Sequence, residues 1–348
     1  NNIPCNRITE QDGIKMRKAI IAMSGGVDSS VAALLTKETG DECIGATMKL
    51  FHNEDIGVKR EKTCCSLDDV EDARSVAHNL GMPYYVFNFT ADFKKQVMDR
   101  FVAAYENGAT PNPCIDCNRY LKFNSLYHRA EELGCHYVVT GHYARIEQRE
   151  DGRYLLKKAA DPAKDQSYVL YSLTQEQLAH TMFPLGDMNK HQTRMIADQQ
   201  NFYNADKPDS QDICFVPDQD YAGFIARETG EKELPGNFVT ADGRVLGQHK
   251  GISHYTVGQR KGLNLAMGHP VFVTQIRPET REVVIGEAED VFTDRLTADH
   301  INYMAADHFE EGQTLTAKIR CLSNSSCRAS VASSRLMPSF SVTADGGR

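Results

Sequence analysis

A short glycine turn, Ser24-Gly-Gly-Val-Asp-Ser29, constrains the fold of this chain more than any other segment. Before it, Lys18 to Met23 is apolar enough to form a buried strand. After it, Ser29 to Thr39 is expected to form a helix that Gly40 ends. The two glycines allow a sharp turn and let backbone N–H groups approach a ligand. Serine hydroxyls and the positive end of the helix would complete an anion-binding cradle.

The residues of this turn also exclude two common phosphate loops. The Walker lysine is missing, so the turn is not the usual loop of NTP-hydrolysing proteins. The third glycine of the dinucleotide-binding fingerprint is missing too. The competing interpretation is a tight turn in which glycine serves packing alone. The flanking strand and helix favour the anion cradle.

The first half of the chain alternates strand and helix patterns. Strands are expected at 42–50, 83–89 and 136–140, a helix at 66–81, and helical stripes at 93–105 and 121–133. Such repeated units predict an α/β fold with a doubly wound, mostly parallel sheet that carries helices on both faces. These sheets bind ligands beyond the carboxyl ends of their strands. From about residue 235, short glycine-rich and β-branched segments predict a small β-rich part.

Length and composition narrow the class of protein. A chain of 348 residues exceeds one ordinary domain, so two or three domains are expected. The sequence contains no apolar run near the roughly 18 residues that span a bilayer, and residues 1–15 do not resemble a signal peptide. We therefore expect a cytoplasmic protein without a membrane partner. Ten scattered cysteines then indicate reduced thiols used for chemistry rather than a disulfide framework.

One basic window interrupts this acidic chain. The net charge of −8 argues against a wholly basic nucleic-acid binder. Between Asp242 and Glu279, however, the sequence has no acidic residue, and its Lys and Arg residues are Arg244, Lys250, Arg260, Lys261 and Arg277. Such a run is often only solvated surface. A flexible, glycine-rich basic loop also suits RNA phosphates, and we expect Arg260 and Lys261 to contact them.

The cysteines Cys114 and Cys117 form a Cys-x-x-Cys pair ahead of a predicted helix. The sequence places Cys117 or Asn118 near the helix N-terminus, where the positive potential lowers a thiol pKa. Cys214 follows about 100 residues later. With no second Cys-x-x-Cys, a closed zinc site is not expected. Three thiolates could hold an iron–sulfur cluster, or two thiols could act without one, and both interpretations stay open. Cys43 and Cys135 are expected to be buried and structural.

With these pieces together, the chain resembles the bacterial tRNA-specific 2-thiouridylase family of the PP-loop ATP pyrophosphatase superfamily. The resemblance covers residues 18 to about 320. Its motifs are Ala22-Met-Ser-Gly-Gly-Val-Asp-Ser29, Cys64-Cys-Ser66 with Asp72-Ala-Arg74, Asn112-Pro-Cys-Ile-Asp-Cys-Asn118 with Lys122-Phe123, Thr140-Gly-His-Tyr143, Lys164-Asp-Gln-Ser-Tyr168, Asp209-Ser-Gln-Asp-Ile-Cys-Phe215 and Tyr255-Thr-Val-Gly-Gln-Arg-Lys-Gly-Leu263.

The resemblance implies a reaction and its participants. ATP with Mg²⁺ would adenylate the 2-carbonyl oxygen of the wobble uridine of tRNA, releasing pyrophosphate, and a protein-bound sulfur would displace AMP. Cys117 matches the nucleophile and Cys214 the persulfide carrier, which an upstream donor (a cysteine desulfurase or a sulfur relay protein) would load. A second thiol must regenerate the first by thiol–disulfide attack, so a disulfide bond belongs to the cycle.

The resemblance also assigns contacts residue by residue. Positions that match ATP contacts are Ala22, Met23, Ser24, Gly25, Gly26, Val27, Asp28, Ser29, Met48 and Gly141, with Asp28 expected to help place Mg²⁺ or to orient the loop. Positions that match tRNA contacts are Asn112, Pro113, Cys114, His142, Lys164, Asp165, Gln166 and Arg320. Some relatives carry Asp in place of Cys114, and Asp116 is the nearest acid here.

The implied domains are an extension at 1–15, a PP-loop catalytic domain at 16–217, a central tRNA-binding domain at 218–282 and a C-terminal β-barrel at 283–348. After residue 320 the sequence loses the barrel pattern, so we expect an incomplete or altered barrel. Two alternatives remain. One is another adenylating enzyme of the superfamily, such as a synthetase that uses ammonia. The other is an inactive tRNA- or metal-binding protein.

Overall fold

The computed structural model describes residues 17–52, 67–209, 213–230, 234–291, 295–298, 300–317, 327–333 and 340–344. Its first part is built on a five-stranded sheet whose strand order is β3-β2-β1-β4-β7. All four strand pairs are parallel. The strands are β1 (Lys18–Ala22), β2 (Glu42–Lys49), β3 (Tyr84–Asn88), β4 (Tyr137–Val139) and β7 (Thr181–Met182). The predicted parallel α/β sheet is thereby confirmed.

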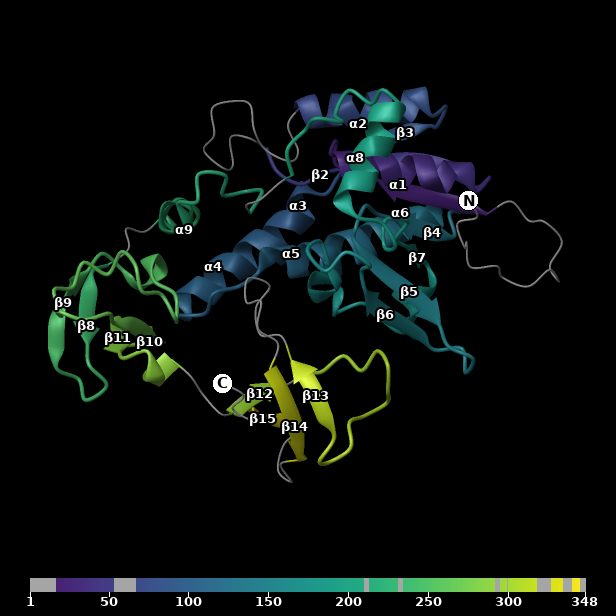
Figure 1. Ribbon diagram of the computed structural model, residues 1–348. Coiled ribbons are helices and arrows are strands. Elements are labelled where there is room, and N and C mark those ends of the chain that lie inside the picture. The colour runs from purple at the N-terminus through teal and green to yellow at the C-terminus, as the bar shows by residue number, and fades with distance from the viewer. Residues whose placement is uncertain are drawn as a thin grey trace.

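Helices cover both faces of this sheet because successive strand residues point to opposite sides. Ala19 and Ile21 of β1 face one hydrophobic cluster, which also contains residues of α1, α2 and α8. Ile20 and Ala22 face a second cluster with residues of α4, η2 and α6. Figure 1 shows α1, α2 and α8 on one side of the strands.

The helices of this part follow the predicted periodicity, with boundaries that shift by a few residues. The expected helix at 29–39 begins two residues earlier, at Val27. The bounds are α1 (Val27–Glu38), α2 (Leu67–Asn79), α3 (Thr90–Phe93), the π-helix η1 (Lys94–Met98), α4 (Asp99–Glu106), α5 (Pro113–Asp116), the π-helix η2 (Cys117–Ser125), α6 (Leu126–Glu132), the 3₁₀ helix η3 (Ser167–Leu170), α7 (Gln175–Ala179), α8 (Lys190–Gln199) and α9 (Tyr221–Thr229).

Three smaller sheets complete the described chain. The hairpin β5 (Ala144–Gln148) and β6 (Tyr154–Lys158) follows β4 directly. A second sheet has the order β10-β11-β8-β9, which confirms the β-rich character predicted from about residue 235. Its elements are β8 (Gly236–Val239), β9 (Val245–His249), the 3₁₀ helix η4 (Ile252–His254), β10 (Phe272–Arg277) and β11 (Glu282–Gly286), and the 3₁₀ helix η5 (Glu289–Val291) follows.

The C-terminal sheet includes strands on both sides of residue 320. Its order is β12-β15-β14-β13, and all its strand pairs are antiparallel. The strands are β12 (Arg295–Ala298), β13 (Thr314–Ala317), β14 (Cys327–Ser333) and β15 (Phe340–Ala344). The chain therefore forms strands after residue 320, and the incomplete or altered barrel stays a prediction. The run Phe-Ser-Val-Thr-Ala of β15 alternates apolar and polar residues, a pattern too short to stand out among the serines around it.

Within the part of the chain that the structure describes, we find no helix long and apolar enough to cross a membrane.

Candidate active site

The strand order places the glycine turn at the switch point of the sheet. From β1 the chain builds outward through β2 to β3, and it then returns to β4 on the other side of β1. Ligands bind at such a point because the loops after the two central strands diverge there. We call residues 24–29 the glycine loop. It follows β1, and Thr140-Gly141 follows β4.

The glycine loop has a conformation that requires glycine. Gly25 lies in the left-handed region, with φ of 76°. A Cβ atom there would overlap the backbone of Asp69 in α2. Gly141 is restricted by packing instead, since its Cβ would lie 2.7 Å from the carbonyl carbon of Asp28 and 2.8 Å from the amide nitrogen of Ser29. The loops after β1 and β4 are therefore in direct backbone contact.

Serine hydroxyls brace this loop from inside. The Ser29 Oγ donates to the Gly26 carbonyl over 2.9 Å, and the Ser30 Oγ reaches the same oxygen over 3.1 Å. The Ser24 amide donates to the Ser29 Oγ over 3.2 Å. Ser24 is exposed, whereas Ser29 and Ser30 are buried. Ser29 and Ser30 thus hold the turn at the start of α1 and are less available as ligand donors than the sequence suggested.

Asp28 is held by Lys190 and Tyr143, and the sequence had assigned neither residue a contact. Lys190, the first residue of α8, donates to both carboxylate oxygens over 2.7 and 2.8 Å. The Tyr143 hydroxyl donates to Asp28 Oδ1 over 2.8 Å and contacts the Thr193 hydroxyl over 2.9 Å. Burial raises the pKa of Tyr143, so its hydroxyl remains protonated. These contacts fit an Asp28 that orients the loop.

A second carboxylate, that of Asp209, forms ion pairs with the basic side chains near the glycine loop. Asp209 pairs with Lys190 at 2.6 Å, Lys164 at 2.7 Å and Arg194 at 3.2 Å. Burial raises the pKa of Asp209, but hydrogen bonds from Lys164 and Lys190 outweigh it and lower the pKa to about 2. Lys190 therefore bridges Asp28 of the glycine loop and Asp209, which lies five positions before Cys214 in the sequence.

Further residues grip the glycine loop from the segment after α8. The Asn204 side-chain amide donates to the Gly25 carbonyl and to the Ser30 Oγ, both over 2.9 Å. Lys207 Nζ lies 3.3 Å from the same carbonyl and pairs with Asp69 and Asp72 of α2. The sequence did contain signals for α8, which carries Lys190 and Arg194. Asn189 and Gln192 have the spacing of a helix-capping pair, and Lys190 and Arg194 have the four-residue spacing that places two side chains on one helix face.

The cysteine segment begins a helical stretch earlier than expected. Asn112 caps α5 by accepting the Cys114 amide over 3.1 Å, and Pro113 fills the first helical position. Cys114 therefore lies in the first turn and is exposed. Cys117 begins the π-helix η2, so it lies about one turn farther from the start of the helical stretch than the sequence indicated. The helix starts upstream because proline is tolerated at its first position.

Both predicted catalytic cysteines pack against one hydrophobic cluster. Cys117 and Cys214 are partly buried and contact the cluster that contains Phe93, Leu121 and Phe215. No disulfide bond joins any cysteine pair among Cys43, Cys114, Cys117, Cys135 and Cys214, so a standing disulfide is not part of the described structure. Cys43 and Cys135 are buried as predicted, and burial raises the pKa of the Cys43 thiol to about 11.

Asp116 lies between Cys114 and Cys117 in the sequence and pairs with Arg100 at 3.5 Å. Burial raises the pKa of its carboxyl, although the charges of Arg100 and Arg119 act in the opposite direction. A carboxyl with a raised pKa can exchange a proton more readily near neutral pH. Asp116 therefore stays a candidate for proton transfer beside Cys117.

A metal site does not emerge from these residues. Over the described ranges, no group of three or more His, Cys, Asp and Glu side chains could hold a metal ion. Cys114, Cys117 and Cys214 are all described, so the iron–sulfur interpretation has no support. Cys114 is exposed, while Cys117 and Cys214 are partly buried against the hydrophobic cluster.

The predicted RNA contacts after β4 have different environments. His142 is buried, its Nδ1 lies 2.7 Å from the Thr140 hydroxyl, and burial lowers its pKa well below the usual value. A neutral ring makes no ion pair with phosphate. Gln166 accepts the Tyr143 amide over 2.9 Å, and Asp165 accepts the Ala159 amide over 3.0 Å. Both side chains therefore shape the loop that carries Lys164.

The basic window divides into paired and exposed residues. Arg260 and Lys261 are exposed, and neither makes an ion pair with a described residue. Gln259 orders their loop by contacts to the Thr256 amide and the Lys261 carbonyl. Arg277 is paired with Glu282 at 3.3 Å. Arg320 lies outside the described residues.

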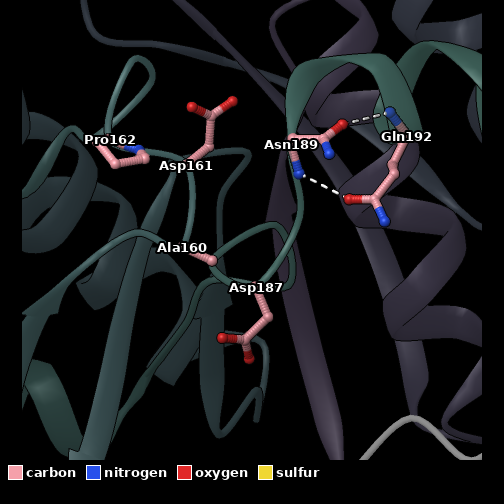
Figure 2. Close-up of a pocket in the computed structure, with 6 residues that line it drawn as sticks. All are labelled: Ala160, Asp161, Pro162, Asp187, Asn189 and Gln192. Atoms are coloured by element: carbon pink, nitrogen blue, oxygen red, sulfur yellow. Dashed lines mark hydrogen bonds between the residues drawn. The ribbon is translucent and has the colours of Figure 1, made fainter.

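A surface hollow of about 290 Å³ lies beside this site, between the 160–162 turn and the start of α8 (Figure 2). It is lined by Ala160, Asp161, Pro162, Asp187, Asn189 and Gln192. Asp161 and Asp187 would repel a phosphate, and the hollow includes neither the glycine loop nor a cysteine. We therefore do not assign the nucleotide to it.

Comparisons with known proteins all give names of tRNA-modifying proteins, but the family models and the relatives differ in the reaction they name. The sequence model of a family described as tRNA methyl transferase HUP domain matches residues 17–218, and one described as tRNA methyl transferase PRC-barrel domain matches residues 222–287. A "tRNA-specific 2-thiouridylase MnmA" of Lachnoclostridium phytofermentans is 56% identical over 306 residues, which cover 88% of this chain and 86% of that protein. The protein of the same name from Clostridioides difficile is 50% identical over 305 residues, covering 87% and 84%.

Among solved structures, a 4-thiouridine synthetase–RNA complex with bound ATP resembles this chain weakly. It has a TM-score of 0.37 and 20% identity, over 58% of this chain and 45% of that one. A likeness at this level carries no argument about function.

Proposed function

The chain belongs to the tRNA-specific 2-thiouridylase family, and we propose that it replaces the 2-oxygen of the wobble uridine in tRNA with sulfur at the expense of ATP. It is an enzyme of the sulfurtransferase class, and ATP and tRNA are its substrates. The observation that carries the proposal is one arrangement: a glycine loop at the switch point of the sheet, tied through Lys190 to Asp209, five positions before Cys214 in the sequence.

In the first step, the uridine 2-oxygen attacks the α-phosphorus of ATP, forms an O–P bond and releases pyrophosphate. The amides of the glycine loop would hold the phosphates, supported by the positive end of α1. Ala22 and Met23 lead into that loop, and Met48 lies near the end of the adjacent β2. Mg²⁺ would arrive with ATP and offset phosphate charge. Asp28 would hold the loop through Lys190 and Tyr143.

In the second step, the outer sulfur of a Cys214 persulfide attacks C2, and AMP leaves with the former carbonyl oxygen. The adduct is then a disulfide between C2 and Cys214. The Cys117 thiolate attacks the Cys214 sulfur of that adduct, the S–S bond breaks, and 2-thiouridine departs. A Cys117–Cys214 disulfide remains, and an external dithiol must reduce it. A persulfide donor of the desulfurase or relay class must then reload Cys214.

The RNA would approach from the side of the cysteine segment. Chemistry on a 2-carbonyl requires the base to leave its stack and enter the site. We propose that Asn112 to Cys114 approach that base and that Lys164 to Gln166 contact the RNA near it. Arg260 and Lys261 would bind phosphates farther along the molecule. We place the reaction in the cytoplasm, where unmodified tRNA and ATP are both available.

Mass spectrometry of tRNA nucleosides tests this proposal. Purified protein, ATP, Mg²⁺, a persulfide donor and tRNA should yield 2-thiouridine together with AMP and pyrophosphate. Cys117→Ala should consume ATP without completing sulfur transfer. Cys214→Ser should lose the ability to carry transferable sulfur, and normal thiolation by Cys214→Ser would contradict the assignment of that residue.

The same experiment addresses a second candidate function, which the descriptions of the matched family models suggest. A methyl transferase would add a methyl group to tRNA from a methyl donor and would need neither cysteine. A methylated nucleoside, or no 2-thiouridine in any reaction, would overturn the proposal.

A further inference from the structure

We propose that Asn204 and Lys207 are positioning residues for the glycine loop: they hold the Gly25 carbonyl away from the bound nucleotide so that the loop amides face its phosphates. This inference rests on the proposed function, since it takes ATP as the ligand of the loop. None of the motifs that identified the site includes Asn204 or Lys207. The inference therefore concerns a second set of residues, which contact the loop rather than the substrate.

The geometry of one peptide group starts the argument. An anion site needs N–H groups turned inward and carbonyl oxygens turned outward, because a carbonyl oxygen would repel phosphate. The described peptide bonds are all trans, so the Gly25 carbonyl and the Gly26 N–H point in opposite directions. Whatever holds the carbonyl outward therefore also directs the Gly26 N–H inward.

Asn204 provides the first of these holding contacts. Its amide nitrogen donates to the Gly25 carbonyl over 2.9 Å, and the residue is only 3% exposed. The assignment of nitrogen to that position is fixed, because a carbonyl oxygen can only accept. The same nitrogen reaches the Ser30 Oγ, so Asn204 joins both ends of the turn. Its oxygen is buried without a hydrogen-bond partner among the described residues.

That unpartnered oxygen has a consequence. A buried acceptor without a partner destabilises the fold, whereas a smaller or apolar side chain would avoid the cost. Asn204 therefore contributes its donor at the expense of stability. A loss of stability at a residue that contacts a binding loop is typical of functional sites.

Lys207 provides the second contact and ties it to α2. Its ammonium group lies 3.3 Å from the Gly25 carbonyl and pairs with Asp69 and Asp72. Burial lowers the pKa of Lys207, but Asp69 and Asp72 outweigh it and the pKa is raised, so the group stays charged. Gly25 also packs against the Asp69 backbone. The carbonyl is thus enclosed by α2 on one side and by the 204–207 segment on the other.

Four variants and a control test the inference by equilibrium binding of Mg²⁺-ATP. Asn204→Asp keeps the shape of the side chain but removes the donor, and Asn201→Asp makes the same change at an exposed position of the same segment. Lys207→Met removes the ammonium group, while Lys207→Arg keeps a cation. Asp72→Asn removes a partner of Lys207 but no contact with Gly25.

We expect Asn204→Asp and Lys207→Met to weaken ATP binding by about tenfold or more. This is the expected effect of losing one charge-assisted hydrogen bond, because the Gly26 N–H would no longer point at a phosphate. Both variants should raise KM for ATP more than they lower kcat and leave tRNA affinity near that of the Asn201→Asp control. Lys207→Arg should restore most of the affinity.

If Asn204→Asp does not fold, Lys207→Met decides the question, since that side chain is partly exposed. Unchanged ATP affinity in folded Lys207→Met, or an equal loss in Asp72→Asn, would overturn the inference and leave the proposed function intact. A wild-type protein that binds no ATP would overturn both.

Discussion

Asp209 is the residue at which the charges near the glycine loop converge. It accepts from Lys164 and Lys190 and pairs with Arg194, while Lys190 also neutralises Asp28. Because the two carboxylates share one ammonium group, the negative charge of Asp28 is offset beside a loop that must accept an anion. The side chain of Asp209 is 29% exposed, so these pairs are screened less than ordinary surface pairs.

The lowered pKa of Asp209 predicts a defined pH dependence of stability. Its folded-state pKa of about 2 lies below the model-peptide value of 3.8, so the ionised form stabilises the fold. This contribution is present above about pH 4 and is lost as the pH falls toward 2. Asp209→Asn should therefore lower the free energy of unfolding by about 1–2 kcal/mol at pH 7. Urea unfolding of the wild type and of Asp209→Asn at pH 7, 4 and 3 measures this difference in the free energy of unfolding.

Asp187→Asn is the matched control for this prediction, because Asp187 pairs with Arg145 but its side chain is 78% exposed. Asp187→Asn should have nearly the same free energy of unfolding as the wild type at every pH. A difference between wild type and Asp209→Asn that stays constant from pH 7 to pH 3 would contradict the assigned role.

The helical stretch of α5, η2 and α6 is the element that carries the candidate nucleophile. It begins at Pro113 and changes to a π-helix at Cys117. A π-helix widens the turn and is frequent at functional sites. Asn118 in this π-helix is buried, and its side-chain amide donates to the Val169 carbonyl over 3.2 Å. This contact fixes the start of η2 to the segment that carries Val169.

Asn112→Ala should destabilise this element. The Asn112 side chain accepts the Cys114 amide, and the loss of such a cap costs about 1 kcal/mol. Thermal unfolding should show a lower Tm, and hydrogen exchange should be faster at residues 114–116. Asn112→Asp keeps an acceptor and adds a negative charge at the helix N-terminus, so it should unfold like wild type. Equal destabilisation by both changes would show that the cap is unimportant.

The sequence predicted elements whose signals are local and missed contacts whose partners are distant. The glycine loop and β1 to β4 follow from glycine positions and apolar periodicity within short windows. Lys190, Asn204 and Lys207 were missed because they reach the loop across more than 160 positions of sequence. The resemblance assigned His142 an RNA contact, which stays a prediction, and periodicity did not show that its ring lies beside Phe123 and Phe183.

At the scale of the whole molecule, two regions connect the parallel-sheet part to the β-rich parts. Arg153 of the β5–β6 hairpin donates to the carbonyls of Tyr303, Met304 and Ala306 and pairs with Asp307. Near the end of α4, a Cβ at Gly108 would touch Ile276. The sheet β10-β11-β8-β9, which we call the central sheet, thus lies next to the end of α4, as Figure 1 shows. The central sheet with Arg260 and Lys261 is therefore attached next to the helix layer that carries the cysteines.

This placement gives the basic loop a testable role in RNA affinity. Replacing both Arg260 and Lys261 with Ala should weaken tRNA binding and reduce the slope of log K against log salt by up to about 2, because each phosphate contact releases counterions. Filter binding over a salt series measures both quantities. Arg277→Gln is the control from the same window, since Glu282 already neutralises that charge and the slope should not change.

An unchanged slope in the double variant would make the window ordinary solvated surface. A slope that falls as much in Arg277→Gln would show instead that the whole window acts by its summed charge. Only a loss confined to Arg260 and Lys261 supports phosphate contacts at their loop, where Gln259 fixes the backbone that presents them.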